Sequence, residues 1–213
     1  ILLMGNPNVG KSVFFSNMTG IDVVSSNFAG TTVTYTEGTM ELGNKTYSLI
    51  DVPGTYSMEA TSDAEAVAVK FMMSNPLAVL CVIDATNLER NIKLAIELQK
   101  YNVPIVYALN LVDVAKRHGK EINVAVLAQE LGGPVIPTIA VKGEGLKEVK
   151  EALQDVLENP KTACSSCASC PGCSSEGLDI WDRAREITAK VRKDVKSELS
   201  FLDKLGASML KPW

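Results

Sequence analysis

The chain has 213 residues, of which 46% are hydrophobic, so it can bury the core of one domain and carry an appendage. Its net charge of −4 offers no positive field, and no local basic patch is present, which argues against nucleic acid as a partner. It has no signal peptide and no apolar run of about 18 residues that would span a membrane. Because it opens without methionine inside an apparent strand, we expect a fragment of a longer protein.

Continuous apolar runs bounded by turn residues are typical of parallel strands that are buried on both faces. Such runs predict strands at residues 1–4, 47–52, 77–83, 104–109 and 135–141. Residues 39–42 are followed by Gly43-Asn44-Lys45 and predict a hairpin with the second run, which adds one antiparallel edge strand.

Stretches with helical periodicity lie between these runs, at residues 62–73, 88–101, 122–131 and 146–157. Strands that alternate with helices form a doubly wound sheet with right-handed crossovers. The sequence therefore predicts an α/β fold with a mostly parallel six-stranded sheet, one of whose edge strands is antiparallel, and a C-terminal helical appendage.

The composition divides the chain into three parts. Residues 1–158 carry the α/β pattern, residues 159–177 form a small, polar, cysteine-rich linker or insertion, and residues 178–213 are amphipathic. The last part predicts one long helix or two short ones, whose apolar stripe packs on a partner helix or on the α/β domain; direct binding to a membrane surface is the alternative. The stripe consists of Ile180, Ala184, Ile187, Val191, Val195, Leu199, Leu202, Leu205 and Met209.

The segment after the first strand matches G-x-x-x-x-G-K-[ST], the pattern of a phosphate-binding loop between a strand and a helix. The two glycines let backbone N–H groups turn toward phosphate oxygens. Lys11 adds a positive charge at the outer phosphates, and the Ser12 hydroxyl is a candidate ligand of Mg²⁺. An ordinary glycine-rich turn is the alternative. The nucleotide-binding residues expected here are Asn8, Val9, Gly10, Lys11, Ser12 and Val13.

Two later segments indicate a guanine nucleotide. In Asn110-Leu111-Val112-Asp113, the Asp113 carboxylate can accept from two N–H groups of guanine, and Asn110 would brace the loop. Leu111 stands where the commoner motif has lysine. After the last strand we expect the Ala140 N–H to reach the guanine oxygen and Lys142 to lie against the base, with Val141 between them; a plain strand-to-helix loop is the alternative.

The γ-phosphate end of the site is expected from two further segments. In Asp51-Val52-Pro53-Gly54, Asp51 is a direct or indirect ligand of Mg²⁺ and the Gly54 N–H meets the γ-phosphate. Residues 27–33 have no strong propensity and suit a switch that gains order with nucleotide. Within this segment, which includes Gly30, we choose Thr32 as the Mg²⁺-binding hydroxyl, with Thr31 as the fallback.

Thr55 occupies the place where Ras-like GTPases have a glutamine that positions water, so intrinsic hydrolysis should be slow. Some GTPases use K⁺ instead of an arginine finger and bind it through an asparagine at the position of Asn8. Asn8 therefore indicates K⁺ assistance, and a loop asparagine bonded to its own backbone is the alternative. The catalytic candidates of this P-loop GTPase are Asn8, Lys11, Thr32 and Gly54.

The phosphate loop, the Gly30-Thr31-Thr32-Val33 switch and above all Asp51-Val52-Pro53-Gly54-Thr55-Tyr56-Ser57 resemble the G domain of the ferrous iron transport protein B family. The resemblance covers residues 1 to about 158. It implies the cytoplasmic N-terminal part of a bacterial inner-membrane Fe²⁺ transporter that binds GTP with Mg²⁺ and hydrolyses it slowly with K⁺.

The C-terminal part departs from the family, which usually carries a longer helical bundle that couples to the membrane segment. Here the bundle is abbreviated, and its end still resembles the approach to a first transmembrane helix. We expect the partners to be the protein's own transmembrane domain, Fe²⁺ as cargo and small proteins of the FeoA or FeoC type. A helix on a long linker also suggests a homo-oligomer with exchanged helices.

Four cysteines at intervals of three, Cys164, Cys167, Cys170 and Cys173, could converge on Zn²⁺ or an Fe–S cluster. Their run also resembles that of FeoC. Reactive or disulfide-forming thiols and a loop without function are the alternatives. Cys81 lies inside a predicted strand and is expected in the core.

Two other functions compete with the transporter interpretation. One is a soluble K⁺-dependent GTPase of translation or tRNA modification, which the acidic composition disfavours. The other is a nucleotide-gated binding module whose hydrolysis is incidental.

Overall fold

The computed structural model describes residues 1–20, 23–159 and 179–194, and a seven-stranded sheet forms its centre. The strand order is β2-β3-β4-β1-β5-β6-β8. From β4 to β8 the neighbours are parallel, whereas β2 and β3 extend the sheet in antiparallel fashion. The strands are β1 (Leu2–Gly5), β2 (Val23–Asn27), β3 (Thr34–Leu42), β4 (Lys45–Asp51), β5 (Val79–Asp84), β6 (Ile105–Asn110) and β8 (Val135–Pro137).

The predicted mostly parallel α/β sheet with an antiparallel edge is confirmed, but it has seven strands instead of six. The additional strand is β2, which pairs with β3 from Val23 to Asn27. Most of its side chains are exposed, so no buried apolar run revealed it. β8 is shorter than predicted, because the chain turns after Pro137 and forms the 3₁₀ helix η1 (Ala140–Lys142).

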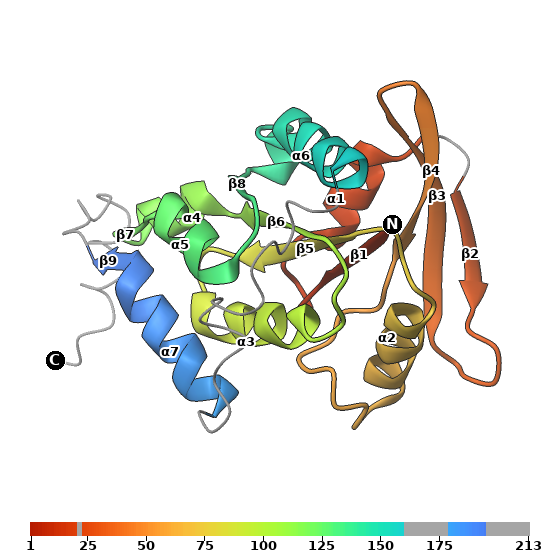
Figure 1. The fold of residues 1–213 in the computed structure, drawn as a ribbon, viewed down its shortest axis with the longest axis horizontal. Helices are drawn as coiled ribbons and strands as arrows, with labels where there is room; N and C mark the ends of the chain where they lie inside the picture. The colour runs from red at the N-terminus through yellow and green to blue at the C-terminus, as the bar shows by residue number, and fades with distance from the viewer. Residues whose placement is uncertain (21–22, 160–178, 195–213) are drawn as a thin grey trace, which may run out of the picture.

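Helices cover both faces of this sheet. Figure 1 shows α1 and α6 on one side, and α2 and α3 on the other. The helices are α1 (Lys11–Met18), α2 (Asp63–Met73), α3 (Leu88–Gln99), α4 (Val112–Arg117), α5 (Val124–Leu131), α6 (Leu146–Glu158) and α7 (Ile180–Val191). Residue 122, predicted as helical, belongs instead to the short strand β7 (Lys120–Ile122), and Asn123 caps α5 by accepting from the Val126 N–H.

The strands alternate their side chains between two apolar cores, as a period of two residues requires. In β1, Leu2 and Met4 join the core beneath α3, whereas Leu3 joins the core beneath α1 and α6. Cys81 in β5 is buried with the first group, as expected, and burial raises the pKa of its thiol to about 12. Because both faces are covered, the carboxyl ends of the parallel strands form the edge at which a site can open.

The described part of the C-terminal segment packs on the α/β domain. Ala184, Ile187 and Val191 of α7 are buried in the core that α3 and α5 also line. The predicted packing of the apolar stripe is therefore confirmed for this helix. The helix ends at Val191, and the chain continues as β9 (Arg192–Asp194), antiparallel to β7. The rest of the stripe lies outside the described residues.

Among the helices of residues 1–20, 23–159 and 179–194, none combines the length and the apolar character that crossing a bilayer requires.

Candidate functional site: a phosphate loop and a base pocket

The phosphate loop joins β1 to α1 through backbone conformations that the sequence selects. Gly5 has φ 154° and Gly10 has φ 94°. A Cβ at Gly5 would lie 2.6 Å from the Val82 carbonyl oxygen, and one at Gly10 would lie 2.6 Å from Asn110 Nδ2. Asn8 also adopts a left-handed conformation, at φ 65°. The loop therefore needs glycine at both ends of its turn, as its motif predicted.

The start of α1 is suited to an anion. Its N-cap is Gly10, which supplies no side-chain hydrogen bond, and the first turn contains no acidic residue. The first N–H groups of a helix lack intrahelical acceptors and carry a partial positive charge. Lys11 and Ser12 open this helix, so both predicted phosphate-end side chains lie at that terminus.

Lys11 and Asp51 form the electrostatic centre of the site. Burial lowers the pKa of the Lys11 ammonium, and the nearby Asp51 carboxylate counteracts this effect. Burial raises the pKa of the Asp51 carboxyl, and Lys11 counteracts it in turn. Asp51 Oδ1 is buried and has no hydrogen-bond partner within the described part of the chain. A buried carboxylate oxygen without a partner fits a hard cation, so Asp51 with Ser12 suits Mg²⁺.

Gly54 lies against the phosphate loop, as the predicted contact with the γ-phosphate requires. A Cβ at this position would lie 2.9 Å from Pro7 Cα and 3.0 Å from Lys11 Nζ. The next residue, Thr55, donates its N–H to the Gly5 carbonyl at 3.3 Å. Its side chain is only 2% exposed, and its hydroxyl has no partner among the described residues. The hydroxyl therefore does not face solvent, where an attacking water would arrive.

Asn110 braces the site as the sequence predicted. Its Nδ2 donates to the Val9 carbonyl at 2.9 Å, and its Oδ1 accepts from the Ala140 N–H at 3.0 Å. Asn17 of α1 donates to the Ala140 carbonyl at 2.9 Å. The phosphate loop, β6 and the turn at Ala140 are thus joined into one unit. Sequence reasoning missed Asn17, because an asparagine inside a helix carries no motif.

The base end of the site contains Asp113 in α4 and the turn of η1. Asp113 Oδ1 is buried without a hydrogen-bond partner in the described segments, while Oδ2 lies 3.7 Å from Arg117. Leu111 adopts φ 63° at the N-cap of α4. Val141 is 73% exposed, and Lys142 is exposed beside it. The Ala140 N–H is bound to Asn110 here, so contact with a guanine oxygen would require it to share or release that bond.

The switch segment does not join this cluster. Two hydrogen bonds form a turn in this segment: the Phe28 N–H donates to the Val33 carbonyl, and the Thr31 hydroxyl donates to the Phe28 carbonyl. Whether the segment changes with nucleotide, as we expect, stays a prediction. The Phe28 ring packs on Phe71 of α2, with 5.3 Å between ring centroids. Figure 1 shows the β2–β3 turn at the α2 end of the sheet. Gly30 and Thr32 lie exposed in this turn.

The structure contains no group of three or more His, Cys, Asp or Glu side chains arranged to hold a metal, within residues 1–20, 23–159 and 179–194. The four clustered cysteines lie outside those residues, so the structure does not bear on their role. Asn8, the residue predicted to bind K⁺, is exposed in the phosphate loop.

Comparison with known proteins matches most of the chain to a known family. A family model described as "Ferrous iron transport protein B" matches residues 1–153. The curated protein "Fe(2+) transporter FeoB" of Escherichia coli (strain K12) is 37% identical over 162 residues, which are 74% of this chain. They are 21% of that relative, so the chain spans about a fifth of its length.

Solved structures give the same result. A mutant of NFeoB from S. thermophilus, bound to GDP, matches with a TM-score of 0.69 at 37% identity, over 72% of this chain and 60% of that one. The cytosolic domain of FeoB from T. maritima, in its GMPPNP form, matches with a TM-score of 0.77 at 25% identity, over 91% and 98%. The second match extends beyond the α/β domain.

Proposed function

Because the chain belongs to the ferrous iron transport protein B family, we propose that it binds GTP and hydrolyses it slowly as the cytoplasmic domain of a bacterial Fe²⁺ transporter. The observation that carries this proposal is the unit built around Asn110. It holds the phosphate loop, the Asp113 segment and the Ala140 turn together, so that one nucleotide can contact all three.

Each residue group has a distinct part in this function. The loop N–H groups and Lys11 hold the β- and γ-phosphates, while the Gly54 N–H contacts the γ-phosphate. Ser12, Asp51 and, after the switch moves, Thr32 hold Mg²⁺, which neutralises phosphate charge. Asp113 accepts from the guanine N–H groups, whereas Val141 and Lys142 lie along the base.

Slow hydrolysis follows from Thr55. A side chain that is buried and short cannot orient water as a glutamine does, which leaves backbone groups and an external cation to stabilise the transition state. Asn8 would hold K⁺ through its amide oxygen at the rim of the loop. The burial of the short Thr55 side chain also favours the second candidate, a nucleotide-gated binding module whose hydrolysis is incidental.

The transport part of the proposal rests on the relatives, whose name is "Fe(2+) transporter FeoB" and which are several times longer than this chain. We place the chain at the cytoplasmic face of the inner membrane, with the protein's own transmembrane domain and FeoA- or FeoC-type proteins as partners. A homo-oligomer with exchanged α7 helices would reproduce, between two chains, the packing of α7 on α3 seen within one.

The Asp113→Asn variant tests the nucleotide assignment. The asparagine amide places an N–H donor where the two N–H groups of guanine need a second acceptor oxygen, so affinity for GDP should fall at least about tenfold. Xanthosine diphosphate has an oxygen in place of the guanine amino group, and its affinity should rise. Competition against a fluorescent guanine nucleotide measures both. Unchanged GDP affinity would refute the base assignment.

Single-turnover hydrolysis of GTP in K⁺ and in Na⁺ separates the two candidates. We expect faster turnover in K⁺, and loss of that difference in Asn8→Ala. Binding without turnover in either cation would support the binding module and remove the enzyme assignment.

We also propose that Cys164, Cys167, Cys170 and Cys173 hold Zn²⁺ or an Fe–S cluster. Metal analysis of anaerobically purified protein tests this, with all four cysteines replaced by serine as the control. Equal metal content in both would end the proposal.

A further inference from the structure

A buried ion pair on α3 contacts the segment that follows Gly54. Glu97 is 3% exposed, and its Oε2 accepts from the Met58 N–H at 2.7 Å. Its Oε1 lies 2.6 Å from Lys93 Nζ and 3.4 Å from the Ser57 hydroxyl. A buried carboxylate is costly unless it is paired and hydrogen-bonded, and Glu97 meets both conditions only while Met58 and Lys93 stay in place.

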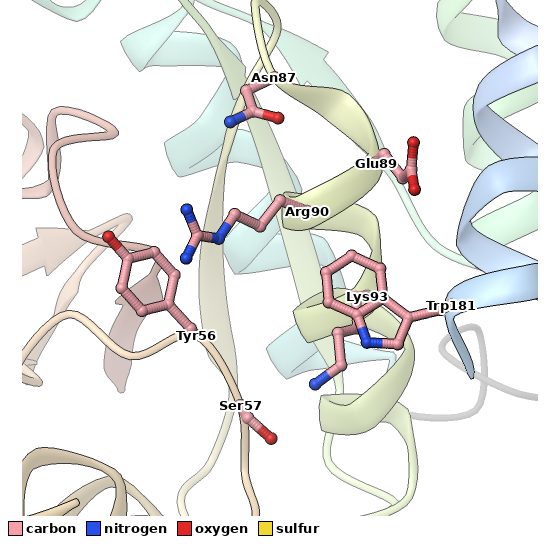
Figure 2. Close-up of a pocket in the computed structure, with 7 residues that line it drawn as sticks. All are labelled: Tyr56, Ser57, Asn87, Glu89, Arg90, Lys93 and Trp181. Carbon is pink, nitrogen blue, oxygen red and sulfur yellow. The ribbon is translucent and has the colours of Figure 1, made fainter. Parts of the chain in front are cut away.

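The same ion pair contacts α7 through Trp181. Lys93 Nζ lies 5.4 Å from the centroid of the Trp181 ring. Figure 2 shows Tyr56 and Ser57 on one side, Arg90 and Lys93 of α3 in the middle, and Trp181 on the other side. These residues line a cavity of about 440 Å³. Arg90 stacks on Tyr56 at 3.7 Å. Lys93 therefore lies between the segment after Gly54 and the first turn of α7.

The position of Met58 gives this contact a functional meaning. Residues 52–61 form neither helix nor strand. The capping box of α2, which begins at Ser62, holds the C-terminal end of this segment. Gly54 must present its N–H to a γ-phosphate, and Met58 is four residues further along the chain. A fixed Met58 limits the positions that Gly54 can reach, and a shifted Gly54 pulls on the bond to Glu97.

We propose that Glu97, charge-balanced by Lys93, is a positioning residue that fixes the Gly54–Met58 segment for hydrolysis and transmits its movement to α7 at Trp181. This inference rests on the proposed GTPase function and adds the residues through which the nucleotide state reaches the C-terminal helix.

Trp181 provides the readout. The chain has two tryptophans, Trp181 and Trp213, so a Trp213→Phe background leaves Trp181 as the single emitter. In that background we expect its emission to differ between Mg²⁺–GDP and Mg²⁺–GMPPNP. Glu97→Gln should abolish most of that difference and lower kcat about tenfold or more, with KM and GDP affinity within about twofold.

Two further variants keep the test decisive. Glu97→Gln leaves Lys93 buried without its partner, so the double variant Glu97→Gln/Lys93→Met removes both charges and provides a stably folded comparison. It should also lack the emission difference. Glu89→Gln is the matched control, because Glu89 lines the same cavity but pairs only with the exposed Arg185, at 3.8 Å, in the described segments; it should behave as wild type.

The outcomes separate the two proposals. If the wild-type chain binds guanine nucleotide but Trp181 emission does not respond, or if the folded double variant keeps the response and its kcat, the Glu97 proposal is wrong and the GTPase proposal stands. If a fluorescent guanine nucleotide does not bind the wild-type chain at all, both are overturned.

Discussion

Asn110 shows how one amide can organise a site. It uses its donor on the Val9 carbonyl and its acceptor on the Ala140 N–H, and its side chain is 2% exposed. A buried side chain of this kind contributes mainly through what its loss leaves behind, which is a buried backbone group without a hydrogen-bond partner.

Asn110→Ala should therefore weaken both folding and binding. We expect a loss of about 2 kcal/mol in the free energy of unfolding and a fall in GDP affinity of at least about tenfold. Denaturant unfolding and nucleotide titration measure the two effects. Thr138→Ala is a useful control, since its hydroxyl lies at the longer distance of 3.4 Å from Asn110 Oδ1. A folded Asn110→Ala with unchanged affinity would contradict the bracing role.

Asp51 predicts a pH dependence of stability in the absence of nucleotide and Mg²⁺. Burial raises its pKa above the ordinary value of 3.8. The folded chain thus binds this proton more tightly than the unfolded chain, so the contribution of this carboxyl is fully present below pH 3.8 and is lost as pH rises through the raised pKa. Thermal unfolding should show wild type losing stability relative to Asp51→Asn over that window. A difference that stays constant or grows in favour of wild type would contradict it.

At the scale of elements, the switch turn is held against α2 by aromatic packing. Phe71 lies 5.3 Å from Phe28 and 5.1 Å from Tyr35 between ring centroids, both in edge arrangements. Lys70 lies 5.2 Å from the Phe28 centroid. If Thr32 is to complete a Mg²⁺ site, this packing has to be released or shifted, so its strength opposes the active arrangement of the switch.

Phe71→Ala should loosen the switch turn. We expect a loss of about 2 kcal/mol in stability, since Phe71 is partly buried, and faster hydrogen exchange at the Phe28 and Thr31 amides. Met73→Ala on the same helix is the control, because Met73 is 69% exposed and should change stability by less than about 0.5 kcal/mol. Equal exchange at these amides in both variants would show that the aromatic contacts do not hold the turn.

At the scale of the whole molecule, α7 joins the α/β domain through an apolar stripe and a buried cation. Arg183 lies 2.6 Å from Glu130 of α5 and 2.9 Å from Glu186, and its side chain is 8% exposed. Lys190 also reaches Glu130, at 3.1 Å. The helix is therefore packed as part of the domain core, and its loss would leave apolar surface of α3 and α5 in water.

Arg183→Ala should cost at least about 2 kcal/mol of stability, because it leaves Glu130, whose side chain is only 16% exposed, with Lys190 as its one remaining ion-pair partner in the described segments. Arg185→Ala, on the same helix, should cost less than about 0.5 kcal/mol, since Arg185 is 59% exposed and its ion pairs are at the surface. Denaturant midpoints compare the two. Similar values would mean that the buried pair does not anchor α7.

The sequence alone predicted most of the local structure. Apolar runs located the parallel strands, and helical periodicity located α2, α3, α5 and α6 to within a few residues, because each pattern repeats over neighbouring positions. The six-residue helix α4 was not predicted, since it is too short to show such a repeat. The phosphate loop and the Asn110–Asp113 segment were recognisable because their chemistry depends on residues at short, fixed spacings in the sequence. The strand β2 was missed because its side chains are mostly exposed.

Only the tertiary structure determined the contacts between segments that are distant in the chain. The bond from Asn110 to Val9 joins residues 101 positions apart, and the bond from Glu97 to Met58 joins residues 39 apart. The packing of the Phe28 turn on α2 and the packing of α7 on α3 also join segments that are distant in the chain. A periodic pattern shows which face of an element is apolar, but packing in three dimensions determines which element covers that face.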